Sequence, residues 1–322
     1  MKKLCHCYPE IVSVDNLLLA WEEFVKGKRD KRDVQQFGMN LMDNIFALHH
    51  DLVNFKYRHG GYEAFRVFDP KPRDIHKASV RDRLVHHTVY RILYPFFDRT
   101  FISDSYSCRN KKGTHKALEK FRQYFNKVSF NNTLTCYCLK MDIRKFFASI
   151  DHKILITILQ KYIADKDCLG LLENIIGSFR SKERAVGLPL GNSTSQLLVN
   201  VYMNEFDQFV KHQLKEKYYI RYADDFVILS RDYKHLVYIV LPIKTYLKKM
   251  LKLEVHPSKI FIKTIASGLD FLGYVIFTDH HILRTKTKKR MFKRICEKNL
   301  PSYLGLLKHC NSYKLARKLI RP

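Results

Sequence analysis

Hydrophobic side chains recur along this chain at two spacings, and each spacing predicts one kind of element. A spacing of three or four residues with charged side chains between predicts helices, whereas short runs rich in β-branched and aromatic residues predict strands. The predicted helices cover residues 16–21, 37–52, 79–94, 151–163, 169–179, 192–215 and 234–251, with more between 283 and 322. The predicted strands cover residues 65–69, 136–141, 217–222, 226–230, 258–264 and 268–277. This mixed order, with hairpins, predicts an α+β fold in which a mainly antiparallel sheet is backed by helices.

Residues 217–230, KYYIRYADDFVILS, carry the strongest signal for chemistry. Apolar-rich strands flank Asp224 and Asp225 at the point where a hairpin would turn. Adjacent carboxylates repel each other, and each raises the cost of ionising its neighbour. Carboxylate oxygens suit a hard divalent ion such as Mg²⁺, which also keeps waters and takes substrate phosphates. A bare pair of aspartates is more often a solvated turn, but the apolar flanks and a third acid upstream favour a metal site.

The third acid is Asp142, which ends the predicted strand at residues 136–141. If this strand and the hairpin are neighbours, the three aspartates can hold a pair of Mg²⁺ ions. One ion would activate an attacking 3′-hydroxyl, and the other would hold the departing pyrophosphate. Positioning and charge neutralisation supply most of phosphoryl-transfer catalysis, so no covalent nucleophile is needed.

The net charge of the chain indicates what kind of partner it binds. The chain has 58 Lys and Arg against 31 Asp and Glu, a formal charge of +27, together with 19 Tyr and 22 Phe. These numbers fit a surface that neutralises phosphates and stacks bases. A basic protein can instead bind a membrane surface, but this chain has no apolar run long enough to cross a bilayer. No apolar stretch follows the basic N-terminus, which argues against a signal peptide. The eight cysteines are expected to be free thiols.

Several stretches of the chain occur in the order of known polymerase motifs. They are PKPR (70–73), RDRLVHH (81–87), SYSCRNKKGTHKA (105–117), MDIRKFF (141–147), GLPLGNSTSQ (187–196), RYADDFVIL (221–229), HPSK (256–259) and FLGY (271–274). In this order, from about residue 60 to the C-terminus, they resemble the fingers and palm motifs of bacterial reverse transcriptases. The resemblance implies a right-hand polymerase with fingers, palm and thumb. Its regions would be a helical N-terminal extension (1–60), fingers (61–135), a palm (136–277, with a fingers-side helical insertion at about 152–186) and a basic helical thumb (278–322).

The resemblance also implies roles for individual positions. Asp142, Ile143, Asp224 and Asp225 would bind metal, and the three aspartates would be catalytic, with Asp225 the weaker ligand. The nucleotide would be bound by Arg66, Arg73, Phe147, Leu190, Gly191, Gln196 and Lys259. The primer grip would be Phe271, Leu272, Gly273 and Tyr274, for which a plain sheet strand is the alternative.

These roles make physical sense for the residue types present. Phe147 matches a steric gate, where a ring crowds a ribose 2′-hydroxyl, although a core position is the rival for one of the rings of Phe146 and Phe147. Arg66 and Arg73 would clamp a triphosphate with forked guanidinium donors, or else be solvated charges. Lys259 would lie near the pyrophosphate as a candidate acid.

One departure from the usual motif narrows the family. Most reverse transcriptases have Gln-Gly-x-x-x-Ser-Pro, whereas this chain has Leu190-Gly191-x-x-x-Ser195-Gln196. The change resembles the reverse transcriptases of diversity-generating retroelements, in which it accompanies error-prone copying, especially opposite template adenines. An aliphatic side chain cannot donate the hydrogen bond that a glutamine gives near the nucleotide sugar, so base-pair geometry is checked less tightly.

The resemblance therefore implies an RNA-directed DNA polymerase that makes cDNA with dNTPs and two Mg²⁺ ions. Its partners would be a structured retroelement RNA as template, the cDNA/RNA duplex, and a small basic accessory variability protein that forms a ring, in the cytoplasm of a bacterial or phage-infected cell. The alternative within the fold is a group-II-like or anti-phage defence reverse transcriptase. An RNA-binding protein with a vestigial polymerase site is the alternative from another class; three acids that repel its ligand count against it. RNA synthesis is disfavoured by Phe147.

Overall fold

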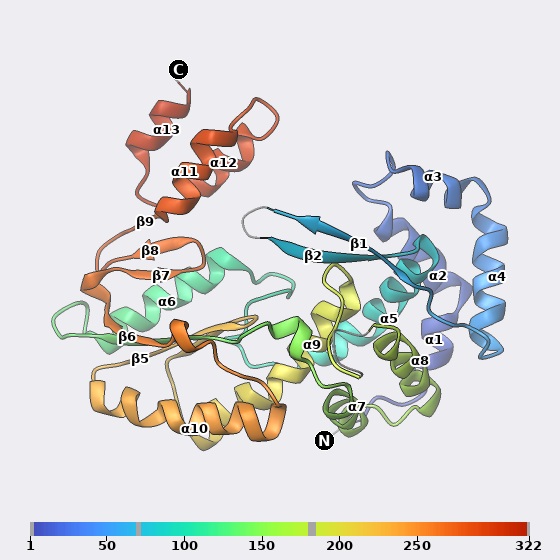
Figure 1. The fold of residues 1–322 in the computed structure, drawn as a ribbon, viewed down its shortest axis with the longest axis horizontal. Helices are drawn as coiled ribbons and strands as arrows, with labels where there is room; N and C mark the ends of the chain where they lie inside the picture. The colour runs from blue at the N-terminus through green and yellow to red at the C-terminus, as the bar shows by residue number, and fades with distance from the viewer. Residues whose placement is uncertain (1–2, 69–71, 180–184, 321–322) are drawn as a thin grey trace. The chain divides into compact units, whose positions relative to one another are not determined.

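The computed structural model of the chain, shown in Figure 1, describes residues 3–68, 72–179 and 185–320. The chain divides into two compact units, each built from segments that are distant in the sequence. The first comprises Met1–Ile102, Ile143–Phe209 and Tyr246–Glu254, and the second comprises Ser103–Asp142, Val210–Thr245 and Val255–Pro322. The predicted division into four consecutive regions, from extension to thumb, stays a prediction.

The first unit is mainly helical. Its helices are α1 (Tyr8–Val12), α2 (Val14–Phe24), α3 (Arg32–Met39), α4 (Leu41–Val53), α5 (Val80–Asp98), α7 (His152–Tyr162), α8 (Lys166–Gly177) and α9 (Ser193–Gln208). Ser13, Ser79 and Asp151 each cap a helix by accepting a hydrogen bond from the backbone N–H three residues later. α5 packs against both α2 and α9, which places it at the centre of this unit. The helix predicted to continue to about residue 215 ends at Gln208 and is followed by one π-helical turn, Phe209–Gln213.

An antiparallel hairpin completes the first unit. β1 (Tyr62–Val67) pairs with β2 (Arg73–Ala78). The first strand begins earlier than residues 65–69 predict, because the Tyr62 hydroxyl hydrogen-bonds Ser178 and its ring packs edge-on against Phe179. Residues 69–71, between the two strands, lie outside the described residues.

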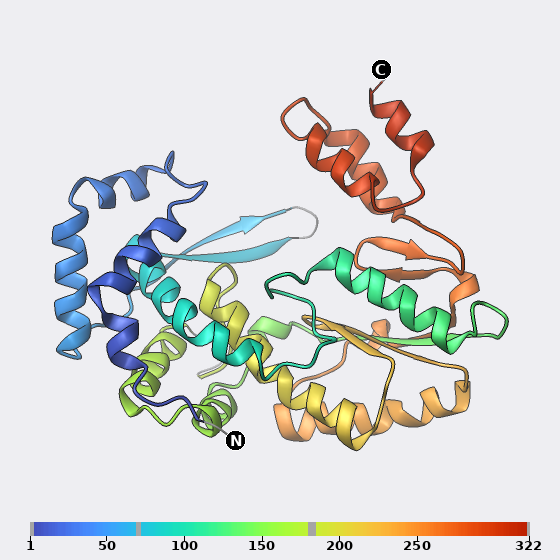
Figure 2. The same cartoon turned by 180° about the vertical axis from the view of Figure 1, so that it is seen from behind.

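The second unit is organised around a four-stranded antiparallel sheet in the order β4-β5-β3-β6. The strands are β3 (Tyr137–Asp142), β4 (Tyr219–Tyr222), β5 (Asp225–Ser230) and β6 (Phe261–Thr264). Figure 1 and Figure 2 both show α6 (Thr114–Val128) on one side of this sheet and the first part of α10 (Tyr233–Leu251) on the other. Alternate residues such as Ile220, Val227 and Leu229 join the core that includes α6. The predicted α+β class, with an antiparallel sheet backed by helices, is confirmed.

A second, three-stranded sheet lies in the same unit, in the order β7-β8-β9. Its strands are β7 (Leu269–Phe271), β8 (Tyr274–Ile276) and β9 (His281–Leu283). The single strand predicted at residues 268–277 is therefore wrong, because the chain reverses at Leu272 and Gly273. Both have positive φ, 50° and 90°, as a two-residue hairpin turn with the twist of its strands requires.

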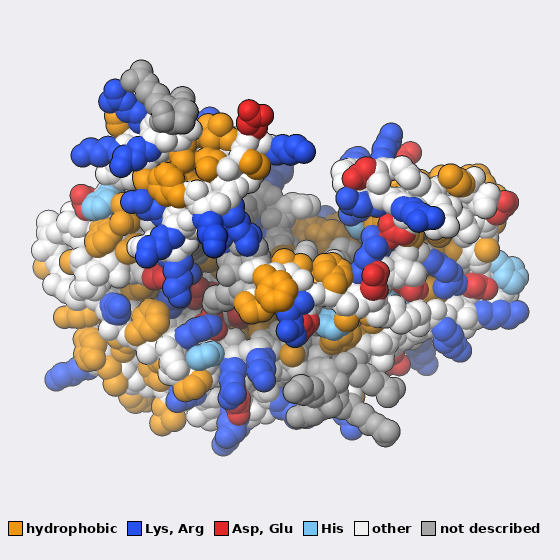
Figure 3. Space-filling view, turned by 45° about the horizontal axis from the view of Figure 1, so that its top comes forward, with side chains coloured by type: hydrophobic (Ala, Val, Ile, Leu, Met, Phe, Trp, Pro, Cys, Tyr) orange, Lys and Arg blue, Asp and Glu red, His pale blue; other side chains and the backbone are white. Residues whose placement is uncertain are grey.

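The chain continues into three short helices, α11 (Thr285–Arg294), α12 (Leu300–Leu307) and α13 (Tyr313–Ile320). Six of the ten residues of α11 are Lys or Arg, and none is acidic. Figure 3 shows these cationic side chains gathered over the C-terminal helices, with hydrophobic side chains between them. Across the described parts of the chain, no helix has a stretch that is both long enough and apolar enough to span a bilayer.

A buried histidine links α5 to the start of α9. His86 is 1% exposed, its Nδ1 lies 2.5 Å from Oγ1 of Thr194, and its Nε2 lies 3.1 Å from Nε2 of His59. Burial, and then the neighbouring His59 and His87, lower the pKa of His86 to about 3. The fold therefore holds this imidazole neutral. Its contribution to stability is complete above the unfolded-state pKa of about 6.5 and is lost as the pH falls from there towards 3.

We expect the substitution His86→Gln to flatten the acid side of the stability profile. Between pH 6 and pH 4 the unfolding free energy of the wild type should fall more steeply than that of the variant, by about 1 kcal/mol per pH unit, because one buried group no longer has to be protonated. Chemical denaturation at several pH values measures the slope. His50→Gln, which removes an exposed histidine, is the control and should keep the wild-type slope. Equal slopes in His86→Gln and the wild type would contradict the expectation.

Candidate active site

Three aspartates come together at one end of the four-stranded sheet. The pairing of β3 with β5 places Asp142 opposite Asp225, and Asp224 lies in the two-residue turn that joins β4 to β5. The other residue of that turn, Ala223, has a φ of 55°, a conformation uncommon for a residue with a Cβ. Directly opposed residues of an antiparallel pair project from the same face of the sheet. The predicted neighbourhood of Asp142 and the hairpin is thus present in the structure.

Asp225 is a carboxylate in an unfavourable setting. Its Oδ2 lies 3.0 Å from Nζ of Lys140, while its Oδ1 is buried and has no hydrogen-bond partner among the described residues. Burial raises the pKa of Asp225 to about 6; Lys140 opposes this shift, and Asp142 and Asp224 add to it. A carboxyl group that is costly to ionise, and that keeps one oxygen without a partner, fits a position where a cation binds.

Asp142 is held by a different lysine. Its Oδ1 lies 2.6 Å from Nζ of Lys259, which belongs to a short 3₁₀ turn, Pro257–Lys259. The backbone N–H of His256 also donates to the Asp142 carbonyl, at 2.8 Å, and so ties this turn to the end of β3. The Lys259 side chain is 37% exposed, so a cation on Asp142 could displace it at small cost. The structure thus places the Lys259 ammonium group on Asp142, and the role expected for Lys259 near the pyrophosphate stays a prediction.

The donor chemistry of this cluster fits Mg²⁺, which prefers carboxylate oxygens. Within residues 3–68, 72–179 and 185–320, no group of three or more His, Cys, Asp or Glu side chains is arranged to hold a metal ion. Instead, the ammonium groups of Lys140 and Lys259 neutralise two of the carboxylates. If the ion binds, Asp142 and Asp224 would hold it, with Asp225 beside them. The assignment of Ile143, a buried residue next in the chain, stays a prediction.

One buried arginine shapes the hairpin turn, a role that the sequence motifs do not predict. Arg221 is fully buried in β4, and its guanidinium donates to the carbonyl of Ala223 at 3.1 Å and to Oγ of Ser105 at 3.0 Å. The Ala223 carbonyl precedes Asp224, so Arg221 fixes the backbone that presents this aspartate. A charged residue two positions before the turn, in an otherwise apolar strand, was the available signal.

The predicted triphosphate-binding arginines lie on the β1–β2 hairpin of the first unit. Nε of Arg66 lies 2.8 Å from Oδ1 of Asp74, the residue directly opposite it, and both side chains are more than half exposed. Arg73 begins β2 and is also exposed. A surface ion pair of this kind contributes little stability, so the Arg66 guanidinium is available to another anion.

The two adjacent phenylalanines have different environments. Phe146 is 4% exposed and belongs to the core, whereas Phe147 is half-buried. Both lie on a 3₁₀ turn, Phe146–Ser149, and the Phe147 carbonyl accepts a hydrogen bond from the N–H of Leu188 at 2.8 Å. Of the two rings, Phe147 is therefore the one that a ligand can reach.

The loop before α9 presents Leu190 and Gly191 beside the β1–β2 hairpin. The Leu190 carbonyl accepts a hydrogen bond from the N–H of His76 at 3.2 Å. Gly191 has a φ of 118°, and a Cβ there would lie 3.4 Å from Cγ2 of Ile75, so glycine is the residue this backbone favours. Leu190 is half-buried, and Gln196, in the first turns of α9, is exposed.

The residues of the predicted primer grip form a hairpin turn, and the residue on each side of the turn is buried in the core. Phe271 and Tyr274 are buried, and the Tyr274 hydroxyl donates to the Leu306 carbonyl of α12 at 3.2 Å. Only Leu272 and Gly273, at the turn, are accessible to a ligand. The Gly273 carbonyl is occupied by the N–H of Arg284 at 3.0 Å.

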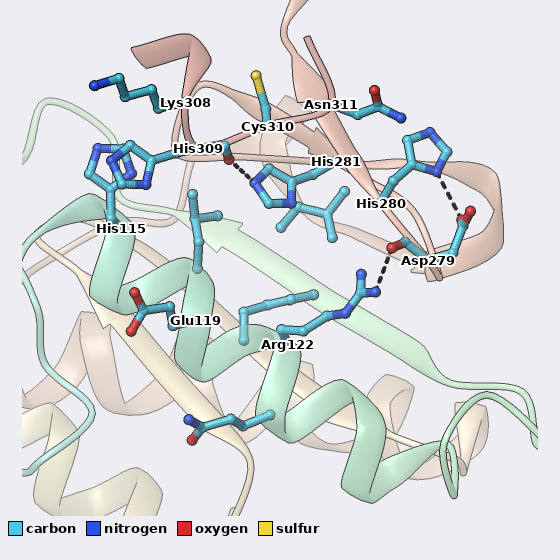
Figure 4. A pocket seen from close by; sticks show the side chains of 14 residues that line it. His115, Glu119, Arg122, Asp279, His280, His281, Lys308, His309, Cys310 and Asn311 are labelled. Atoms are coloured by element: carbon cyan, nitrogen blue, oxygen red, sulfur yellow. Dashed lines mark hydrogen bonds and ion pairs between the residues drawn. The ribbon is translucent and has the colours of Figure 1, made fainter. Parts of the chain in front are cut away.

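A separate cavity of about 620 Å³ lies between α6, the β8–β9 turn and the loop that follows α12. Figure 4 shows His115 and His309 stacked at its edge, and their ring centroids are 3.5 Å apart. The side chain of Arg122 hydrogen-bonds the Asp279 carbonyl across it. None of the predicted site residues lines this cavity.

Comparisons with known proteins identify the family to which this sequence belongs. Residues 69–276 match the family described as reverse transcriptase (RNA-dependent DNA polymerase). Protein YkfC of Escherichia coli is 24% identical over 268 residues, which cover 70% of this chain and 68% of YkfC. The group II intron-encoded protein LtrA of Lactococcus lactis subsp. cremoris is 23% identical over 290 residues, which cover 69% of this chain and 47% of LtrA. The chain thus spans less than half of LtrA.

The fold has a counterpart among solved structures. A telomerase from Candida albicans superposes with a TM-score of 0.54 at 13% sequence identity, covering 71% of this chain and 46% of that one. At this identity the likeness concerns the fold alone. Because the family match extends over more than half of the sequence, the chain belongs to the reverse transcriptase (RNA-dependent DNA polymerase) family.

Proposed function

We propose that this chain makes cDNA from a structured RNA template by two-metal nucleotidyl transfer, and that it is the error-prone enzyme of a diversity-generating retroelement. The observation that carries the first half is the pairing of Asp142 with Asp225 beside Asp224 at one end of a sheet. An RNA-binding protein without this activity has no use for acids that repel its ligand. Two lysines already neutralise these acids, which indicates that the cluster requires positive charge.

In this proposal each group has a distinct task. Asp142 and Asp224, with Asp225 beside them, hold two Mg²⁺ ions, which supply charge neutralisation for phosphoryl transfer when bound. Lys259 gives up its ion pair with Asp142 and becomes available, as a charge and a proton donor, to the leaving pyrophosphate. The accessible ring of Phe147 crowds a ribose 2′-hydroxyl and so selects dNTPs.

The second half of the proposal rests on the loop before α9. Leu190 replaces the glutamine of most reverse transcriptases, and an aliphatic side chain offers no hydrogen bond to a nucleotide. The N–H of His76 holds the Leu190 carbonyl, and Gly191 follows in the left-handed region, so the hairpin and the glycine fix the position of this residue. The checking of base-pair shape is then weaker, and mispairs at template adenines are extended.

The partners follow from charge and from the proposed system. A formal charge of +27 and a dense cluster of Lys and Arg on α11 suit a structured RNA and a cDNA/RNA duplex. A small basic accessory protein that forms a ring belongs to the proposal as a partner. The likeness to the group II intron-encoded protein LtrA favours the second candidate, a group-II-like or defence reverse transcriptase that copies accurately.

Primer extension on an RNA template tests the activity. With Mg²⁺ and dNTPs we expect cDNA from the wild type, and a rate at least about a hundredfold lower from Asp224→Asn, because one metal-binding charge is lost. Sequencing of the product should show errors concentrated at template adenines. Accurate cDNA would favour the group-II-like alternative. No metal-dependent synthesis, even with native RNA and accessory protein supplied, would refute the polymerase proposal.

A substitution in the loop tests the cause of the errors. Leu190→Gln restores a side-chain donor, and we expect misincorporation at template adenines to fall about tenfold, the effect of one hydrogen bond of about 1.4 kcal/mol. Leu190→Met, similar in size but without a donor, should keep the wild-type error rate. Equal error rates in the Gln and Met variants would rule out this role for Leu190.

The neighbouring phenylalanines test sugar selection. Phe147→Val should lower the preference for dNTPs over rNTPs about tenfold or more, because the ring no longer crowds the 2′-hydroxyl. Phe146→Leu serves as the matched control. It should reduce stability by about 1–2 kcal/mol through the cavity it leaves, with sugar preference unchanged. Competition between labelled dNTP and rNTP gives the ratio, and an unchanged ratio in Phe147→Val would remove the steric-gate assignment.

A further inference from the structure

A buried lysine lies beneath the aspartate cluster, and neither the family motifs nor the proposed function assigns it a role. Lys140 is in the central strand β3, two residues before Asp142, and is 7% exposed. Residues two apart on a strand project from the same face, so Lys140 points to the side on which Asp142 and Asp225 lie. That side is the one covered by α6 and by the second sheet, because the neighbouring Cys138 and Val227 belong to their shared core.

Lys140 contacts two elements that are far apart in the sequence. Its Nζ lies 3.0 Å from Oδ2 of Asp225 and 2.7 Å from the backbone carbonyl of Asp270, and 5.5 Å from the centre of the Phe271 ring. The first partner is a member of the aspartate cluster. The other two belong to β7, immediately before the turn at Leu272 and Gly273.

These contacts are geometrically demanding. A buried ammonium group is tolerated only where charged and polar partners satisfy it, and removing one partner leaves an uncompensated buried charge. Lys140 therefore keeps the Asp225 carboxylate and the Asp270 carbonyl within hydrogen-bond distance of the same ammonium group. Lys259, by contrast, is partly exposed and, among the acids that the structure describes, pairs with Asp142, so it offers a natural comparison.

We infer that Lys140 is a positioning residue that couples the Asp225 carboxylate to the β7–β8 hairpin and so sets the distance between them. The contacts stand on their own, and their meaning for catalysis rests on the proposed function. If the aspartates hold the metal ions and the hairpin holds the primer end, Lys140 fixes the primer terminus relative to the ions. The Asp270 carboxylate pairs with Arg284, which leaves its backbone carbonyl as the group that Lys140 holds.

Hydrogen exchange of the metal-free protein tests the coupling without any nucleic acid. In Lys140→Met we expect amides of residues 269–276 to exchange about tenfold faster or more, because a charge-assisted hydrogen bond to β7 is lost. Lys259→Met removes the same charge from the same cluster without touching β7, and should leave these amides unchanged. Equal exchange in Lys140→Met and the wild type would overturn the inference.

A second experiment tests the contact between Lys140 and Asp225. It stays informative if Lys140→Met alone does not fold. Lys140→Met leaves the Asp225 carboxylate buried without its cation, so the double variant Lys140→Met/Asp225→Asn should melt at a higher temperature than Lys140→Met alone. The hairpin amides should still exchange fast in the double variant. A melting temperature lowered additively by the two substitutions would show that the residues are not coupled.

A kinetic readout separates positioning from a merely structural role. In primer extension corrected for the fraction of active sites, Lys140→Met should lower kcat while the KM for dNTP stays unchanged, and Lys140→Arg, which can contact both partners, should recover part of the loss. Unchanged kcat per active site would contradict the positioning role. A chain that makes no cDNA at all would defeat the proposed function, whereas the exchange and melting results would still decide the coupling.

Discussion

Repulsion among carboxylates is the constraint on which this end of the structure depends. Asp142 and Asp225 are held opposite each other by the pairing of β3 with β5, with Asp224 in the adjoining turn. The fold tolerates them by placing one ammonium group on each of two acids, Lys259 on Asp142 and Lys140 on Asp225. Such an arrangement lowers the stability of the fold, and destabilising charge clusters of this kind occur mainly at functional sites.

The two lysines differ in a way that makes chemical sense. Lys259 is on a short turn and partly exposed, so its charge can leave when another cation arrives. Lys140 is in the central strand and buried, with a backbone carbonyl as its second partner, so it stays. One lysine thus pairs with its acid in a partly exposed position, and the other joins the Asp225 carboxylate to β7.

Much of this could be predicted from the sequence, and the remainder could not, for physical reasons. The alternation of apolar residues around Asp142 and around residues 217–230 predicts strands that end in acids, and the motifs predict that these strands are neighbours. The sequence pattern predicts one continuous strand across the turn at Leu272 and Gly273, because leucine rarely adopts the positive φ that Leu272 has here. The roles of Lys140 and Arg221 depend on contacts with Asp270 and Ser105, which only the folded chain brings near.

The central claim is that the three aspartates form a metal centre for nucleotidyl transfer. Its most direct test is a Mn²⁺ titration, followed by electron paramagnetic resonance, of the chain bound to a non-extendable primer–template and a dNTP. The account predicts two tightly bound ions per chain for the wild type and the loss of tight binding in Asp142→Asn. Binding that is absent in the wild type, or the same in wild type and variant, would contradict it.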